Sequence, residues 1–166
     1  MIRTALVASL AVLGLAATAH AAPKFVSGVG ATPEAIAASP ISAGAIVPAG
    51  SNIFFVSGIP GSAKAGNTEA QTTDSLTKLK AVLEANGYTL ADVVNAKVYL
   101  VADPATGKMD FAGMNTAFKT FFGVAGEPNK PSRVTVQIAA LAGAGSLVEI
   151  ELVAAKSPAP VHTKKK

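Results

Sequence analysis

The chain has 166 residues, and its 14 lysine and arginine residues exceed its 10 aspartate and glutamate residues, for a net charge of +4. Lysines fill positions 164–166, whereas residues 22–163 are balanced in charge, so neither a surface for nucleic acid nor a nucleic-acid partner is expected. The chain has no cysteine, and its two histidines, His20 and His162, lie near the ends, which argues against thiol or imidazole catalysis and against a metal or other cofactor.

Residues 1–21 are typical of a secretory signal peptide. Arg3 precedes an apolar run over residues 5–17, and Ala19 and Ala21 form a small-x-small cleavage site. An uncleaved anchor is the alternative, although the run is short for a bilayer. We expect cleavage after Ala21, a periplasmic or secreted protein, and no membrane association once the signal is removed. Residues 22–157 then form a single domain, and residues 158–166 a disordered Lys-rich tail.

The first part of this domain carries weak strand signals at residues 24–26 and 45–47 and a clear one at residues 51–58. The clear run is β-branched and aromatic, and it ends at Ser57. The Ser57 hydroxyl either bonds nearby backbone or points into a site. Residues 58–66 contain three glycines and a lysine without the spacing of a phosphate-binding loop, so they are predicted to form a loop.

Two helices and a strand follow. Asn67 is predicted to cap a helix that runs to residues 86–87, with Leu76, Leu79, Val82 and Leu83 on its buried stripe. Residues 93–101 alternate as a strand. Residues 110–122 read as a second helix whose apolar face holds Phe111, Met114, Phe118, Phe121 and Phe122. Asn115 lies beside that face and has either a structural hydrogen bond or a place in a site.

The last two segments, residues 132–138 and 147–152, alternate polar and apolar residues with the period of a strand. A hairpin is the simple interpretation. It would bury Val134, Val136 and Ile138 with the apolar residues of the second strand, and the other face would carry Arg133, Thr135, Gln137, Glu149 and Glu151. This face holds either an ordinary cross-strand ion pair or an anion site in which Arg133 binds a carboxylate.

These elements predict an α+β domain with one mixed sheet and two helices packed on one face. The sequence of this domain resembles that of the Rid family, the reactive intermediate deaminases also called RidA/YjgF. The similarity is carried by GSNIFFVSG-IP, SLTKLKAVLEANGYTLADVVNAKVYL, DFAGMNTAFKTFF, PSRVTVQIAAL and LVEIELVA, over residues 51–155. The resemblance implies a chorismate-mutase-like (Rid) fold and a homotrimer with clefts between subunits.

The resemblance also implies roles for individual residues. Arg133 matches the family's carboxylate-binding arginine, and Glu149 matches the glutamate that positions a water molecule. Ser57 and Asn115 match residues of the substrate site, and Thr135 stands where many members have a small thiol. Two further departures are the absence of the family's tyrosine before the central strand and of its glutamine between Gly58 and Ile59.

The implied activity is that of a 2-iminobutanoate/2-iminopropanoate deaminase-like hydrolase, which converts enamines and imines of 2-amino acids to 2-keto acids and ammonia. We therefore expect catalytic Arg133 and Glu149, substrate-binding Ser57, Asn115 and Thr135, a small-molecule carboxylate substrate and no cofactor. The alternative is a non-catalytic module that binds a small carboxylate in the periplasm. The nuclease or translation-inhibitor role reported for some relatives is a third class, disfavoured by the balanced charge and the lack of histidine.

Overall fold

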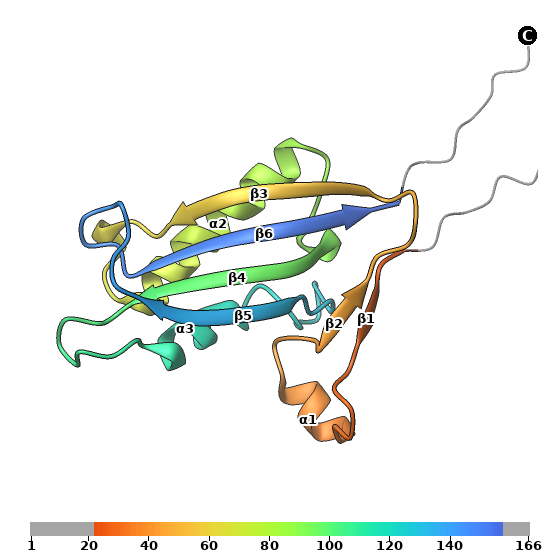
Figure 1. The fold of residues 1–166 in the computed structure, drawn as a ribbon, viewed down its shortest axis with the longest axis horizontal. Coiled ribbons are helices and arrows are strands. Elements are labelled where there is room, and N and C mark those ends of the chain that lie inside the picture. The colour runs from red at the N-terminus through yellow and green to blue at the C-terminus, as the bar shows by residue number, and fades with distance from the viewer. Residues whose placement is uncertain (1–21, 158–166) are drawn as a thin grey trace, which may run out of the picture.

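The structure is a computed structural model that describes residues 22–157, so the predicted signal peptide and Lys-rich tail lie outside the described residues. Along the chain the elements are β1 (Lys24–Val26), α1 (Pro33–Ala38), β2 (Gly44–Ile46), β3 (Asn52–Pro60), the 3₁₀ turn η1 (Ala63–Ala65), α2 (Thr68–Ala85), η2 (Leu90–Asp92), β4 (Val93–Val101), α3 (Phe111–Phe118), β5 (Ser132–Ile138) and β6 (Val148–Lys156). The predicted α+β class is confirmed, with α2 and α3 on one face of a mixed sheet (Figure 1).

The two weak strand signals near the start of the domain are both real, but they form a separate two-stranded sheet, β1–β2, with the unpredicted helix α1 between them. The Thr32 hydroxyl caps α1 by accepting a hydrogen bond from the Ala35 N–H. The Lys130 ammonium donates to the carbonyl of Ile36, at 2.7 Å, and to that of Ala37. This segment lies beside β5 and is tied to the loop that leads into it (Figure 1).

Helix α2 begins and ends as the sequence predicts. The Asn67 side chain accepts a hydrogen bond from the Ala70 N–H, and the chain turns away at Gly87, which has the positive φ of +77° that glycine tolerates best. Leu76, Leu79 and Leu83 are fully buried on its stripe. The helix therefore packs its apolar side on the sheet.

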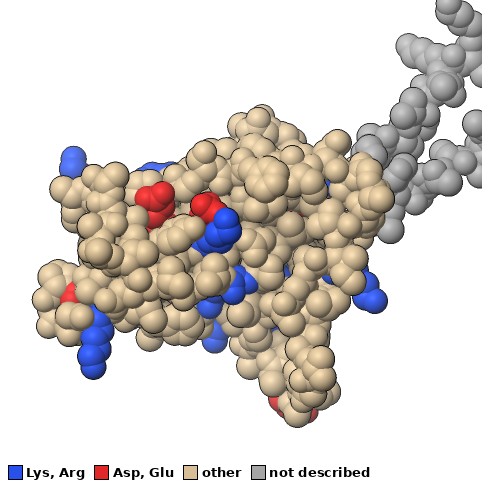
Figure 2. Space-filling view, in the orientation of Figure 1, with Lys and Arg blue, Asp and Glu red and all other residues tan. Residues whose placement is uncertain are grey.

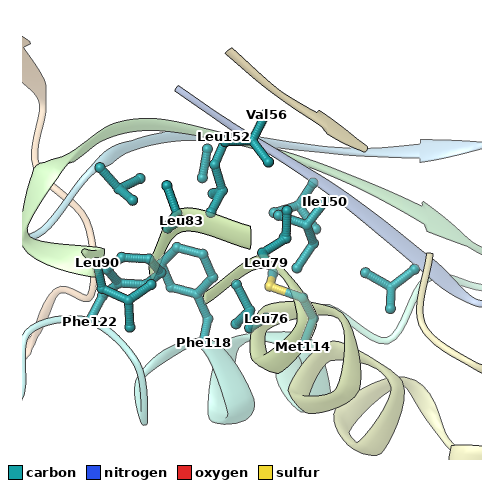
Figure 3. Packing of buried hydrophobic residues seen from close by; sticks show 14 of the residues in the cluster. Val56, Leu76, Leu79, Leu83, Leu90, Met114, Phe118, Phe122, Ile150 and Leu152 are labelled. Carbon is teal, nitrogen blue, oxygen red and sulfur yellow. The ribbon is translucent and has the colours of Figure 1, made fainter. Parts of the chain in front are cut away.

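The core lies between the two helices and the sheet (Figure 3). Met114, Phe118 and Phe122 are buried there as predicted, but Phe111 is 44% exposed. Helix α3 also ends at Phe118, earlier than the predicted residue 122. The sequence pattern thus places most of this apolar face correctly and misplaces its first residue.

The predicted hairpin of the last two strands is wrong. The sheet order is β3-β6-β4-β5, so β4 separates β5 from β6. Strand β5 pairs with β4 in parallel, and β6 pairs antiparallel with β3 and with β4. A parallel partner needs a long crossover, which here contains α3. Strand β5 is consequently an edge of the sheet and β6 lies inside it.

The buried face of β5 is also the reverse of the prediction. Arg133 and Thr135 are paired with Ala96 and Val98 of β4. Ala96 and Val98 are fully buried under the helices, so the side chains of Arg133 and Thr135 project to that same face. Val134 and Val136 point to the opposite face and are 48% and 40% exposed. The alternation along the strand was identified correctly, but its apolar side faces away from the helices.

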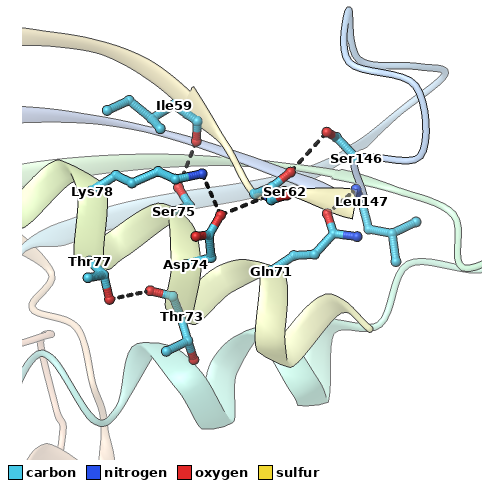
Figure 4. Close-up of polar contacts among 11 residues, drawn as sticks. Ile59, Ser62, Gln71, Thr73, Asp74, Ser75, Thr77, Lys78, Ser146 and Leu147 are labelled. Carbon is cyan, nitrogen blue, oxygen red and sulfur yellow. Dashed lines mark hydrogen bonds and ion pairs between the residues drawn. The ribbon is translucent and has the colours of Figure 1, made fainter. Parts of the chain in front are cut away.

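A network of polar contacts joins two loops at the end of the sheet where β3 ends and β6 begins (Figure 4). Gln71 is buried, and its side-chain oxygen accepts from the Leu147 N–H at 2.8 Å while its nitrogen donates to the Gly145 carbonyl at 3.1 Å. The Ser146 hydroxyl donates to the Gly61 carbonyl at 2.9 Å. These bonds fix the entry to β6 against the exit of β3.

Within residues 22–157, no helix has both the length and the apolar character that crossing a bilayer requires.

Candidate functional site

Arg133 is the centre of the candidate site. It projects from the edge strand β5 toward α3, where its Nη2 donates to the Asn115 Oδ1 at 2.9 Å and its Nη1 approaches the Met114 sulfur at 3.8 Å. Its Cζ lies 4.4 Å from the centre of the Phe118 ring and 5.7 Å from that of Phe111. One amide and three apolar side chains therefore hold the guanidinium, partly through cation–π contact.

Arg133 has no carboxylate partner in the part of the chain that the structure describes. Burial lowers the pKa of Arg133 to about 10, so the side chain remains a cation at neutral pH. The ion pairs among residues 22–157 are Lys78–Asp74, Lys80–Glu84 and Lys97–Glu151. The alternative of an Arg133–Glu149 ion pair is thus wrong for this chain. A partly buried cation without a counter-ion is costly, and an anionic ligand would offset that cost.

Thr135 adds a hydroxyl on the same side of β5 as Arg133. Its Oγ1 is buried and has no hydrogen-bond partner among the described residues, a property shared there by Ser51 and Thr68. Of these three, Thr135 follows Arg133 by two residues on one strand, so their side chains project to one face. An unsatisfied buried hydroxyl is unfavourable.

Glu149 lies on the opposite face of the sheet. It pairs with Tyr99, which also pairs with the exposed Val136. Gly58 lies against its carboxylate so closely that a Cβ at position 58 would collide with Glu149 Oε1. Ser57 is exposed in the adjoining bulge, where the pairing of β3 with β6 shifts register. These residues form a second polar group, separate from Arg133.

The structure therefore divides the predicted site residues between two places. Arg133, Asn115 and Thr135 meet at the β5–α3 edge, and Glu149 and Ser57 lie across the sheet from them. The prediction that Arg133 and Glu149 share a surface of one chain is wrong, because it depended on the hairpin. Within one chain these two groups cannot contact the same small molecule.

None of the helices that the structure describes covers the face of the sheet that carries Glu149 (Figure 1). Its exposed large residues include Phe55, at 75%, together with Ile53, Val134 and Val136. Figure 2 looks onto this face and shows a small group of acidic and basic side chains near its middle. The ion pair of Lys97 and Glu151 lies on this face. An exposed apolar area of this kind is typical of a surface that a partner covers.

Sequence reasoning missed three contacts of Arg133. It assigned Phe111, Met114 and Phe118 to the core, yet all three approach the guanidinium. The available signal was their spacing, because Phe111, Met114, Asn115 and Phe118 recur at three- and four-residue intervals and so share one side of α3. No cluster of three or more metal-binding side chains occurs in the described stretch of the chain.

Comparison with known proteins gives a consistent set of relatives. The pattern that defines the Ribonuc_L-PSP family, described as endoribonuclease L-PSP, matches residues 32–156. A RutC family protein of Pyrococcus horikoshii is 36% identical over 115 residues, which are 66% of this chain and 83% of that protein. The RutC family protein YoaB of Escherichia coli is 38% identical over 104 residues, 63% of this chain and 82% of the relative.

Solved structures agree with this similarity. The Rid family protein YyfB from Yersinia pestis superposes with a TM-score of 0.62 at 24% identity, over 80% of this chain and 97% of that one, which is a likeness of fold. A member of the YjgF/YER057c/UK114 family from Mycobacterium tuberculosis gives a TM-score of 0.52 at 28% identity, over 80% of this chain and 98% of its own.

Proposed function

The chain belongs to the endoribonuclease L-PSP family, also called the YjgF, RutC or Rid family, and on that basis we propose that it is a Rid-type enamine/imine deaminase. Its substrates are reactive 2-imino acids, which it hydrolyses to 2-keto acids and ammonia. The observation that carries the proposal is the Arg133 guanidinium, a partly buried cation with one amide partner and no carboxylate partner among the described residues.

Arg133 fits the carboxylate of a 2-imino acid. The guanidinium has five N–H donors in a planar fork, and the described residues occupy two of them, with Asn115 and more weakly with Met114. The remaining donors suit a carboxylate, and the amide of Asn115 fixes the plane of the fork. We assign Thr135 to the wall of this site, because its side chain projects to the same face of β5 as Arg133.

The reaction needs little from the protein beyond positioning. Water held by the Glu149 carboxylate adds to the carbon of the C=N bond and gives a tetrahedral carbinolamine. The C–N bond then breaks, ammonia leaves, and the oxygen becomes the new carbonyl of the keto acid. Because a protonated imine is already a strong electrophile, one carboxylate and an oriented substrate are sufficient, and the step requires no redox change or cofactor.

The proposal requires more than one chain, because Arg133 and Glu149 lie on opposite faces of the sheet. A second copy that covers the apolar face around Phe55 would bring the β5–α3 edge of one chain beside the Glu149 group of another. We propose a homotrimer, the assembly that the family resemblance implies, with three such composite sites. A surface rich in exposed aliphatic and aromatic residues supports this arrangement.

A direct assay tests the activity. An amino-acid oxidase generates a 2-imino acid in situ, and the full assembly is added while keto acid and ammonia are followed. We expect keto acid and ammonia to form faster than in buffer alone. Arg133→Ala should reduce kcat/KM about 100-fold, because the substrate carboxylate loses its contact with the guanidinium. Lys119→Ala, which removes an exposed cation at the end of α3, serves as the control and should keep full activity.

The alternative function, a module that binds small carboxylates without turning them over, gives a different outcome in the same experiment. Wild-type protein would then bind a stable 2-keto acid in calorimetry and release no product above the buffer rate. Equal hydrolysis by Arg133→Ala and wild type would instead overturn the assignment of the site itself.

We also propose that the protein is exported, since residues 1–21 have the composition of a secretory signal. N-terminal sequencing of the protein from its native cells tests this, with Ala22 expected as the first residue. Recovery of chains that retain Met1 in the cytosolic fraction would contradict export.

A further inference from the structure

Phe111 has no role in the mechanism above, yet it lies next to the group on which that mechanism depends. It is the first residue of α3, and its ring centre is 5.7 Å from the Cζ of Arg133. Phe118, two turns later, approaches the same carbon at 4.4 Å. The two rings differ in burial, because Phe118 is completely buried and Phe111 is 44% exposed. Phe118 thus forms the floor under the guanidinium, and Phe111 forms part of its solvent-facing border.

The described side chains in contact with Arg133 are uncharged, so none of them offers an ionic partner to a charged substrate side chain. Met114 presents a thioether, and the oxygen of Asn115 is already used by Nη2. Thr135 contributes a single hydroxyl. When a 2-imino acid places its carboxylate on the fork of Arg133, its remaining atoms extend only a few ångströms further. An apolar side chain can then cover the exposed Phe111 ring, whereas a charged side chain would be desolvated beside it without a partner.

We propose that Phe111 determines substrate selectivity, and that the preferred substrates are 2-imino acids with branched aliphatic or aromatic side chains rather than 2-iminopropanoate. This inference rests on the proposed deaminase function for its substrate class. It concerns the substrate's side chain, and Arg133 alone recognises the carboxylate. Aromatic rings accept both branched and ring-shaped apolar groups, so selectivity follows from apolar area more than from one shape.

The test compares imines generated in situ from leucine, phenylalanine and alanine. For the wild-type assembly we expect kcat/KM to be at least about 10-fold higher for the two bulky imines, the range that extra methylenes supply in an apolar site. Phe111→Ala should remove most of this preference and leave the alanine-derived imine within about 3-fold of wild type. Phe111→Leu should retain most of it. Ile46→Ala, which truncates an exposed apolar residue of β2, is the control and should leave the ratio unchanged.

Several results would overturn the inference. Equal kcat/KM values for the three imines would do so, as would a uniform loss across all three in Phe111→Ala, which would mean that the ring only supports Arg133. A changed oligomeric mass in Phe111→Ala would show that the ring is a subunit contact instead. If no imine is hydrolysed, the deaminase proposal fails by itself. Selectivity is then measured as calorimetric Kd values for 4-methyl-2-oxopentanoate and pyruvate, and equal values would refute the role of Phe111.

Discussion

The burial of the Arg133 side chain is the reason to interpret its charge as part of a binding site. On an open sheet face, an arginine opposite a glutamate contributes little and indicates no ligand. Here the guanidinium is packed among Phe111, Met114 and Phe118, it contacts no carboxylate of residues 22–157, and burial lowers its pKa to about 10. Lysine cannot replace it well, because an ammonium has no planar fork. The isolated cation is therefore the residue-level property that a functional assay should address first.

Glu149 is predicted to act in turnover more than in binding. We expect Glu149→Gln to keep the affinity for a 2-keto acid within about 3-fold, because Arg133 makes the carboxylate contact, and to lower kcat by about 100-fold, because the amide is a poor base for water. Calorimetry and the imine assay measure the two quantities. Glu151→Gln, on the same strand face, provides the control, and unchanged kcat in Glu149→Gln would remove Glu149 from the mechanism.

At the scale of elements, the sequence predicted where helices and strands lie along the chain better than which strands pair with each other. The cap at Asn67 and the alternation in β4 located their elements closely, because both signals are local. The pairing of β5 could not be predicted in the same way, since alternation gives a strand two faces without saying which is buried or which strand lies beside it. The two predicted site residues Arg133 and Asn115 nevertheless contact each other, because their side chains meet between β5 and α3.

The buried polar side of α2 was missed for a similar reason. The sequence identified its leucine stripe, but Gln71, Thr72 and Ser75 are also buried. The Thr72 hydroxyl donates to the Thr68 carbonyl within the helix, but Gln71 and Ser75 contact backbone groups far away in the sequence. The Ile59 carbonyl near the end of β3, for example, accepts from the Ser75 hydroxyl at 2.7 Å. No pattern within the helix encodes these distant partners.

Gln71 should contribute strongly to stability. Gln71→Ala leaves the Leu147 N–H and the Gly145 carbonyl without their partner, and we expect the free energy of unfolding to fall by on the order of 3 kcal/mol. Urea unfolding at a fixed protein concentration measures this. Thr73→Ala, on the exposed side of α2, is the matched control and should change stability by less than about 0.5 kcal/mol. A similar small loss for Gln71→Ala would show that water replaces its contacts.

At the scale of the whole molecule, the apolar sheet face should be the assembly surface. Phe55→Glu places a charge at its most exposed aromatic residue, so we expect light scattering to give the monomer mass where the wild type gives that of a trimer. Val29→Glu, at a fully exposed position in the turn before α1, should leave the mass unchanged. Circular dichroism checks that both variants are folded, and a folded Phe55→Glu trimer would place the interface elsewhere.

Subunit mixing tests whether one site uses residues of two chains. Arg133→Ala and Glu149→Gln assemblies should each be nearly inactive, and co-expression should restore about a quarter of wild-type activity, since one in four randomly formed boundaries pairs an intact Arg133 with an intact Glu149. Mixing either variant with itself is the control. No recovery in verified mixed assemblies would mean that both residues act within one chain or that Glu149 has no role.

The position of β6 has a consequence for how the chain is made. This strand is the last element along the described chain, yet it lies in the middle of the sheet and is the link between β3 and the β4–β5 pair. During synthesis, β3 and β4 leave the ribosome before β6 has been made. The edges of β3 and β4 that pair with β6 in the finished sheet are unpaired until then. A nascent chain that stalls before Val148 can hold two fragments of a sheet but cannot close it. Completion of the sheet is thereby delayed until residues 148–156 have been translated.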